Sequence, residues 1–216
     1  MLIEIISDVV CPWCHIGRRR LQRALAMRPD MTYRILWRVF QLNPEMPAQG
    51  IDRQAYLTAK FGGAMHAGRI YDAITKAGAA EGIEFRFDRI RRTPNSQNAH
   101  RLSRFAARFG AQDKMIDRLF KAYFEEGEDI GRVEVLADLA ASIGLDRLAV
   151  ADFLFSAAER EAVLAEDRSA RRLGINGVPC FIIDGKYALS GAQEPEFFLP
   201  LFDLGRQDQN SSAAAE

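Results

Sequence analysis

Hydrophobic residues recur along this chain with two different spacings, which predict where strands and helices lie. Residues 2–6 form a short apolar run rich in β-branched side chains, which predicts a buried strand. Behind this run, Ile16, Leu21 and Leu25 recur among polar residues at the spacing of an amphipathic helix. Residues 31–40 then alternate apolar and polar positions, as a second strand does. Strand, helix and strand in this order predict a βαβ unit with a parallel strand pair.

The middle of the chain, residues 52–172, has an almost wholly helical pattern. Glycines lie at or near the ends of the predicted helices, as expected for C-terminal caps and turns. These helices are expected over residues 53–62, 64–80, 96–109, 113–124, 133–143, 148–155 and 159–173. Residues 84–88 are the exception, because their alternation of charged residues and phenylalanine predicts a short extended piece.

A strand pattern returns near the C-terminus. Residues 179–183 form an apolar strand, Asp184-Gly185 is a strong hairpin signal, and residues 186–189 return as the partner strand. A last helix over residues 194–204 completes a ββα unit.

The order of these elements predicts an α/β protein. Neither the βαβ half nor the ββα half can bury its sheet alone, so residues 1–50 and 174–206 are expected to form one domain. Residues 51–173 are then an inserted helical domain. Residues 207–216, rich in Gln, Ser and Ala, are expected to be a flexible tail.

Charge and hydropathy exclude several classes of function. The chain has 216 residues with 29 basic and 29 acidic side chains, a net charge of zero, which argues against a nucleic-acid-binding surface. Arginine clusters at residues 18–20, 89–92 and 171–172 are interpreted as solvated faces. No stretch has the length and polarity of a membrane span, and the segment before Cys11 does not read as an export signal. We therefore expect a cytoplasmic protein that does not bind membranes.

The candidate chemistry lies in Cys11-Pro12-Trp13-Cys14, where the first strand meets the first helix. Pro12 suits the first helical turn, because its missing N–H is one that this turn leaves unpaired. Free N–H groups and the helix dipole at this end favour a thiolate on Cys11. A thiolate attacks disulfides, and Cys14 is close enough to resolve the mixed disulfide that forms. Because structural disulfides are rare in the cytosol, the pair predicts redox catalysis or a metal site.

The segment from Ser7 to Cys14 resembles the DsbA-like thioredoxin-fold oxidoreductases, in particular their FrnE-like branch. A second match, Gly177-Val178-Pro179, is similar to the Gly-Val-Pro loop of that family. The resemblance implies a thioredoxin fold interrupted by a helical insertion, and a thiol–disulfide oxidoreductase or isomerase that acts on protein cysteines. It also implies that Pro179 is cis, packs beside the two cysteines and presents the Val178 backbone to an extended substrate.

Three other interpretations of the cysteine pair compete with this one. Zinc would need further ligands, for which Cys180 and His15 are candidates. The string from Cys11 to His15 also matches the C-x-x-C-H haem-attachment pattern, but haem attachment needs export and an axial partner. Kappa-class glutathione transferases and 2-hydroxychromene-2-carboxylate isomerases resemble the chain as well. Because those enzymes often carry serine at the first cysteine position, the two retained cysteines favour the redox enzyme.

We therefore expect no metal and no cofactor other than the redox-active Cys11–Cys14 disulfide, with glutathione as a candidate redox partner. The expected substrates are cysteine-containing proteins or low-molecular-weight thiols. Oxidases, reductases and isomerases share these residues, because direction follows the reduction potential and the available partner. The sequence predicts neither the direction nor the oligomeric state.

Four residues around the pair have open roles. Asp8, at the end of the first strand, accepts or relays a proton, or it caps a turn. His15 is expected to pack or lie at the surface, with stabilisation of the thiolate as the alternative. Trp13 shapes the site and lowers its polarity, and His100 in the insertion is expected to be structural.

Cys180 follows the loop proline, where the family commonly has threonine. If Pro179 abuts the cysteine pair, Cys180 should lie near the two sulfurs. It is then either a small buried hydrophobic residue or a third redox thiol that pairs with Cys11 or binds metal.

Overall fold

A four-stranded sheet at the centre of the molecule combines strands of the N-terminal βαβ unit with strands of the C-terminal ββα unit. The computed structural model describes residues 1–62 and 64–213. The sheet has the order β2-β1-β5-β6, with β1 (Leu2–Ser7) parallel to β2 (Arg34–Val39). Strands β5 (Cys180–Ile183) and β6 (Tyr187–Ser190) are antiparallel to their neighbours. The predicted fold class, a thioredoxin-like α/β fold, is confirmed.

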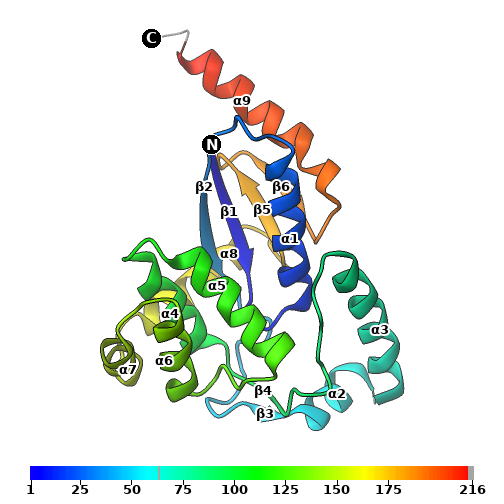
Figure 1. Cartoon of the computed structure of the whole chain (residues 1–216), viewed down its shortest axis with the longest axis vertical. Coiled ribbons are helices and arrows are strands. Elements are labelled where there is room, and N and C mark those ends of the chain that lie inside the picture. Colours follow the sequence, from blue (N-terminus) through cyan, green and yellow to red (C-terminus); the bar gives the residue numbers. More distant parts are fainter. Residues whose placement is uncertain (63, 214–216) are drawn as a thin grey trace.

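Helices cover both faces of this sheet (Figure 1). Helix α1 (Pro12–Ala26) packs on one face, where its Gly17 approaches Phe181 of β5. The 3-10 turn η2 (Pro195–Phe197) leads into α9 (Leu199–Ala213) on the same face. Between them, the Phe198 ring lies edge-on to the Phe181 ring, with 4.9 Å between the ring centres. Helix α8 (Arg160–Arg172) covers the opposite face, where Ala170 packs against Ile6 and Phe40.

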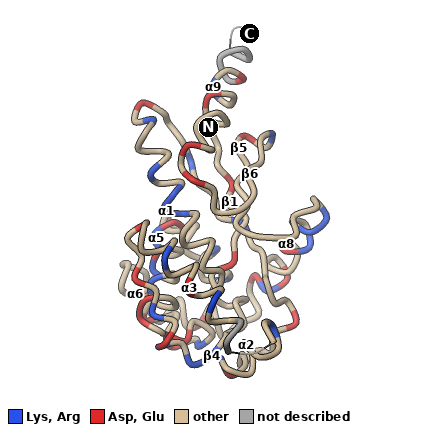
Figure 2. The backbone as a smooth tube through the Cα atoms, turned by 90° about the vertical axis from the view of Figure 1, so that its right-hand side faces the viewer, with Lys and Arg blue, Asp and Glu red and all other residues tan. Residues whose placement is uncertain are grey.

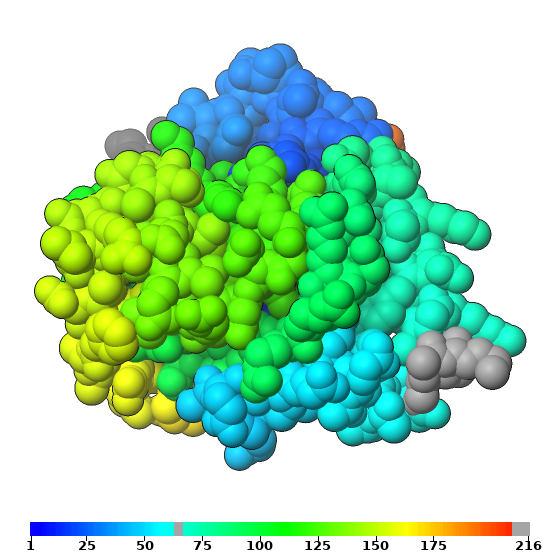
Figure 3. All heavy atoms as spheres, turned by 60° about the horizontal axis from the view of Figure 1, so that its bottom comes forward, coloured from blue at the N-terminus to red at the C-terminus, as the bar shows by residue number. Residues whose placement is uncertain are grey.

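The insertion lies at the end of the sheet toward which β1 runs (Figure 1). Its two halves lie side by side on the lower face of the molecule, the cyan and green segments of Figure 3. A two-stranded sheet of β3 (Ile51–Asp52) and β4 (Arg92–Thr93) lies at its base. The helices are α2 (Arg53–Phe61), α3 (Ala64–Ala80), α4 (Gln97–Ala107), α5 (Gln112–Lys121), α6 (Val133–Ser142) and α7 (Arg147–Phe155), with a π-helical turn η1 (Ala122–Glu126) after α5.

The insertion and the sheet share one apolar core. Buried side chains of α4, α5, α6 and α7 join the core that contains Ile3, Ile5 and both cysteines of the motif. Helix α8, although inside the predicted insertion, packs on the sheet through Ala170. The division at residues 51 and 173 stays a prediction, because the packing runs continuously across it.

The structure adds detail to two local expectations. Residues 84–88 form no strand; Phe85 and Phe87 instead stack at 4.9 Å inside the insertion, while the Arg86 N–H donates to the Phe124 carbonyl. Phe85 is buried and Phe87 is partly buried, so the alternation places both rings against the core without forming a paired strand. The last helix begins later and ends later than residues 194–204, and it includes residues 207–213. The flexibility expected of residues 207–216 stays a prediction. Residues 214–216 of that predicted tail lie outside the described residues.

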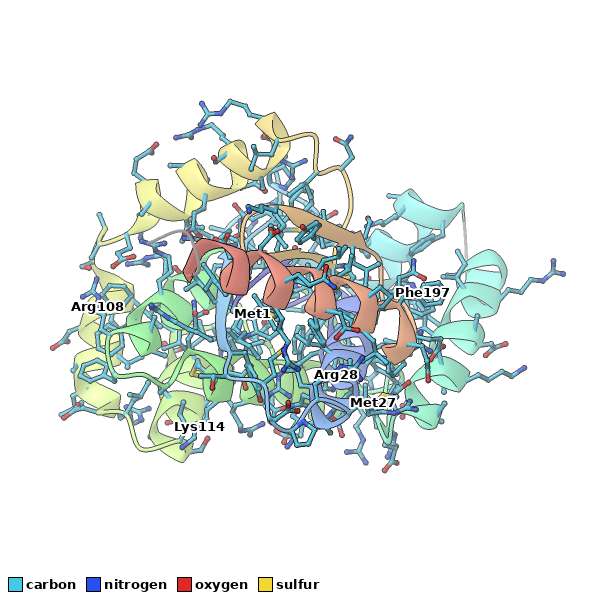
Figure 4. The ribbon with its side chains drawn as sticks, turned by 90° about the horizontal axis from the view of Figure 1, so that it is seen from above. Met1, Met27, Arg28, Arg108, Lys114 and Phe197 are labelled. Atoms are coloured by element: carbon cyan, nitrogen blue, oxygen red, sulfur yellow. The ribbon has the colours of Figure 1, made fainter. Side chains whose placement is uncertain are left out.

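Basic and acidic residues are interspersed along the chain rather than gathered on one side (Figure 2). Arg18 nevertheless contradicts the solvated-face interpretation, because it is buried and forks between Asp113 and Asp117 of α5. Beyond α1, Arg28 pairs with Asp203 of α9 at 3.0 Å, and Figure 4 shows Arg28 and Met27 beneath that helix. Ion pairs therefore join α1 to the insertion, and the segment just after α1 to the last helix.

Candidate functional site

Cys11 and Cys14 lie at the turn from β1 into α1, as predicted. Cys11 is the N-cap residue of the helix, and Pro12 follows at its first position. The Cys11 N–H donates to the Asp8 carbonyl at 3.0 Å, and the Cys11 carbonyl accepts from the Cys14 N–H at 3.1 Å. Both thiols are free and buried, and they are close enough for Cys11 to raise the pKa of Cys14.

The two thiols differ in their surroundings. Cys14 is enclosed on the sheet side of the helix, whereas Cys11 borders a cavity. Burial is the main reason why the pKa of Cys14 lies well above its usual 9.0, and the neighbouring Cys11 raises it further. The Ser7 side chain and the Asp8 backbone offset part of this rise. Cys14 is thus a protonated, shielded thiol at neutral pH, and Cys11 is the thiol that faces the cavity.

The Gly-Val-Pro loop lies against the cysteine pair, as the resemblance implied. The Val178–Pro179 peptide bond is cis. The Cys11 thiol donates to the Val178 carbonyl at 3.6 Å. A Cβ placed on Gly17 of α1 would come within 2.9 Å of the Pro179 ring, so helix and loop touch closely. Trp13 remains 37% exposed beside them.

Asp8 forms a buried hydrogen-bond cluster below the motif. One carboxylate oxygen accepts from the Leu42 N–H at 2.7 Å, and the other lies 3.3 Å from Nε2 of His100. That second oxygen also accepts from the Val10 N–H at 3.3 Å, which caps the turn after β1. Asp8 therefore joins the active-site turn to α4 of the insertion, and its role in proton transfer stays a prediction.

His15 turns away from the sulfurs into the interface between α1 and α5. Its ring stacks on Phe120 at 5.0 Å, and Nε2 lies 3.1 Å from a Glu125 carboxylate oxygen. Burial lowers the pKa of His15 below 6.5, with Glu125 opposing that change. The structure thus places a neutral His15 in a packing position and shows no contact between it and the Cys11 thiol.

Cys180 is on the wrong side of the sheet for the predicted proximity to the two sulfurs. Successive residues of a strand point to opposite faces, and Pro179 and Phe181 both face α1. Cys180 instead packs with Ile6, Phe40 and Ala170 beneath α8. Burial raises its pKa, as expected for an inert thiol in a core. The expectation that it lies near Cys11 and Cys14 is therefore wrong, which also removes it as a shared zinc ligand.

A cavity of about 280 Å³ opens beside Cys11. The motif and the loop before Pro179 form one wall, and α2 and α3 of the insertion form the other. Its lining is largely apolar and aromatic, with two cations, Arg53 and Lys60. Within the described part of the chain, no group of three or more His, Cys, Asp or Glu is placed to hold a metal ion.

The residues by which α2 lines this cavity were not among the candidate site residues predicted from the sequence. Arg53, Tyr56 and Lys60 line the cavity from one side of this helix. Their spacing of i, i+3 and i+7 puts them on one helical face, which was a readable signal. Nothing local indicates that this face lies opposite Cys11, because that juxtaposition depends on how the insertion folds back.

Known proteins are similar to this chain over nearly its full length. The DSBA-like thioredoxin domain family matches residues 2–202. A probable DsbA oxidoreductase from Streptomyces coelicolor is 31% identical, with a TM-score of 0.86 over 96% of this chain and 90% of its own. A cytosolic disulfide reductase, DsbM from Pseudomonas aeruginosa, solved with GSH, is 21% identical, with a TM-score of 0.66 over 99% and 100% of the two chains.

A 2-hydroxychromene-2-carboxylate isomerase structure is also similar in fold. It is 16% identical, with a TM-score of 0.71 over the full length of both chains.

No helix in residues 1–62 and 64–213 is long and apolar enough to cross a membrane.

Proposed function

Because this chain belongs to the DsbA-like thioredoxin domain family, we propose that it is a thiol–disulfide oxidoreductase that works through Cys11 and Cys14. The observation that carries the proposal is the asymmetry of the two thiols. Cys11 caps a helix and faces a cavity, while Cys14 lies behind it, shielded from solvent. An attacking and a resolving thiol need this arrangement.

The exchange proceeds in two balanced steps. The Cys11 thiolate attacks one sulfur of a substrate disulfide, so a mixed disulfide forms and the other substrate half leaves as a thiolate. Cys14 then loses its proton and attacks the Cys11 sulfur, which releases the second substrate thiol. The protein is oxidised by two electrons and the substrate is reduced; oxidation of a substrate dithiol runs the same steps in reverse. The Val178 carbonyl beside Cys11 is available to an extended substrate.

The proposed substrates are either cysteine-containing proteins or low-molecular-weight thiols. Glutathione-linked isomerisation is the second candidate function, because isomerase and GSH-bound reductase structures share the fold. Retention of both cysteines favours disulfide exchange over it. We keep the cytosolic setting as part of the proposal, because the DsbM reductase is described as cytosolic.

Two cysteine variants test the assignment in an insulin-reduction assay. Cys11→Ser should abolish exchange, and Cys14→Ser should accumulate mixed disulfides with a thiol substrate. Full activity of Cys11→Ser would refute the proposal. Glutathione-dependent isomerisation that persists after both cysteines become serine would favour the second candidate.

Peptide mapping of the oxidised protein completes the test. We expect one Cys11–Cys14 linkage, with Cys180 alkylated only after unfolding because it lies on the opposite face of the sheet. A recoverable Cys11–Cys180 linkage would contradict this placement.

A further inference from the structure

Arg53 is a buried cation in the wall of the cavity beside Cys11. Arg53 is the first residue of α2, and it is only 8% exposed to solvent. The guanidinium donates to the Thr93 hydroxyl at 3.1 Å and to the Tyr71 hydroxyl at 2.7 Å. Neither partner carries a negative charge, and no carboxylate among the described residues forms an ion pair with Arg53. A buried charge is ordinarily paired, because leaving it unpaired is costly.

The phenols around Arg53 do not supply the missing charge. The guanidinium lies 5.2 Å from the ring centre of Tyr71 and 5.7 Å from that of Tyr56. Burial raises the pKa of Tyr71 and of Tyr123, which outweighs the opposite effect of Arg53 on both. The Tyr71 hydroxyl is therefore a neutral hydrogen-bond partner of Arg53 at neutral pH.

Arg101 shows how the same chain satisfies a buried arginine that has only a structural task. It is fully buried and donates to four backbone carbonyls around the end of α7 and to Asn98. An arginine has five N–H donors. Arg101 uses its donors on fixed acceptors, whereas the Arg53 guanidinium donates only two hydrogen bonds within the described residues and lines a cavity. Arg53 thus keeps donors for a group that is not part of the fold.

Lys60 adds a second cation on the same wall. Its ammonium donates to the Tyr56 hydroxyl at 2.6 Å, and it forms no ion pair within the described residues. Among the described residues, none that lines the cavity is an aspartate or a glutamate. Its charged groups are therefore both positive, and they share the cavity with the Cys11 thiol.

We propose that Arg53, assisted by Lys60, is the specificity residue of this site and binds a carboxylate of a small thiol or disulfide while its sulfur meets Cys11. A planar guanidinium with free donors matches a carboxylate in a two-bond geometry. This inference rests on the proposed function and deepens it. The site selects low-molecular-weight disulfides that carry a carboxylate over neutral ones of similar size.

Two alkylating agents that differ in one group test the selectivity. Iodoacetate and iodoacetamide both transfer a two-carbon unit to a thiolate with loss of iodide, but only iodoacetate carries a carboxylate. The ratio of their rates at Cys11 in the reduced protein cancels any change in thiolate reactivity. Arg53→Gln should lower the iodoacetate-to-iodoacetamide ratio by about tenfold or more, the value of a hydrogen-bonded charge pair.

Three further variants serve as controls for the effect of Arg53→Gln. Arg53→Lys keeps the positive charge but loses the planar, two-bond donor geometry of the guanidinium, so it should give an intermediate iodoacetate-to-iodoacetamide ratio. Lys60→Gln, at an exposed position, should give a smaller decrease and keeps the test valid if Arg53 variants fail to fold. Arg91→Gln removes an exposed arginine that does not line the cavity, so the same change in net charge should leave the ratio unchanged.

Disulfide probes extend the test to exchange itself. The rate with 5,5′-dithiobis(2-nitrobenzoate), which carries carboxylates, should fall in Arg53→Gln, while the rate with neutral 4,4′-dithiodipyridine should stay within about twofold of wild type. Equal ratios in wild type and Arg53→Gln would overturn the inference and leave the oxidoreductase assignment standing. Failure of both disulfides to oxidise the wild-type Cys11–Cys14 pair would instead overturn the proposed function, and the inference with it.

Discussion

The carboxylate of Asp8 lies 3.3 Å from Nε2 of His100, although 92 residues separate the two in sequence. Asp8 is fully buried and His100 is 3% exposed. The pair connects the turn that carries Cys11 to helix α4 of the insertion. The motif and the insertion are therefore joined by a polar contact inside the core, where a polar group without a hydrogen-bond partner would destabilise the fold.

We expect Asp8→Ala to lower the free energy of unfolding by about 1–3 kcal/mol, because the Leu42 N–H and His100 would both lose a buried acceptor. Urea unfolding measures the change. Asp138→Ala is the matched control: this aspartate pairs with Arg147 at the surface and should cost no more than about 1 kcal/mol. Equal effects of the two substitutions would contradict a structural role for the buried cluster.

Gly17→Ala should destabilise the protein by about 1–3 kcal/mol through overpacking. The added methyl would lie 2.9 Å from the Pro179 ring and 3.1 Å from the Phe181 ring, so the loop or α1 must move. Gly68→Ala in α3 makes the same chemical change where nothing lies within 4 Å, and should be neutral or stabilising by up to about 1 kcal/mol. Thermal unfolding of the two variants distinguishes close packing from helix propensity.

Cys14 should resist alkylation in the folded, reduced protein at neutral pH. Its pKa is raised above 9.0, chiefly by burial, so the reactive thiolate is scarce until the medium is strongly alkaline. In Cys11→Ser the pKa of Cys14 should fall part of the way back, because contact with Cys11 is a secondary cause of the rise. Mass spectrometry after a pulse of iodoacetamide over a pH series follows this. Rapid labelling of wild-type Cys14 at pH 7 would contradict the shielded position.

Acid should weaken the fold through His15. The pKa of this residue is lowered from 6.5 in the folded state, so below pH 6.5 the unfolded chain binds more protons than the folded one. The free energy of unfolding then decreases as the pH falls, with a slope of at most about 1.4 kcal/mol per pH unit from this single group. His15→Phe, which keeps a ring against Phe120, should remove that contribution.

Glu125→Gln gives the complementary result. Glu125 raises the pKa of His15 against the effect of burial, so its removal should lower that pKa further and steepen the loss of stability in acid. Urea unfolding at pH 5.5, 6.5 and 7.5 compares both variants with the wild type. A pH dependence unchanged in both would show that His15 does not titrate differently in the two states.

Local sequence determined the strand, turn and helix around Cys11 because short-range rules act there. An apolar run must be buried, a proline is tolerated in a first helical turn, and Asp184-Gly185 adopts the positive φ angles of 49° and 69° that its hairpin turn requires. At residues 84–88 the alternation marked a break in the helical pattern, but it could not show that the Phe85 and Phe87 rings stack on each other inside the insertion.

Tertiary structure alone decided which residues meet at the site. Cys180 follows Pro179 directly, yet the pleat of β5 directs its thiol to the face covered by α8. A shift of one residue along the strand would have placed it on the α1 face, beside the two cysteines of the motif. Arg53 and His100 reach the motif only because the insertion folds back over the end of β1. Such contacts depend on the packing of a continuous core across the whole chain, and no short segment encodes them.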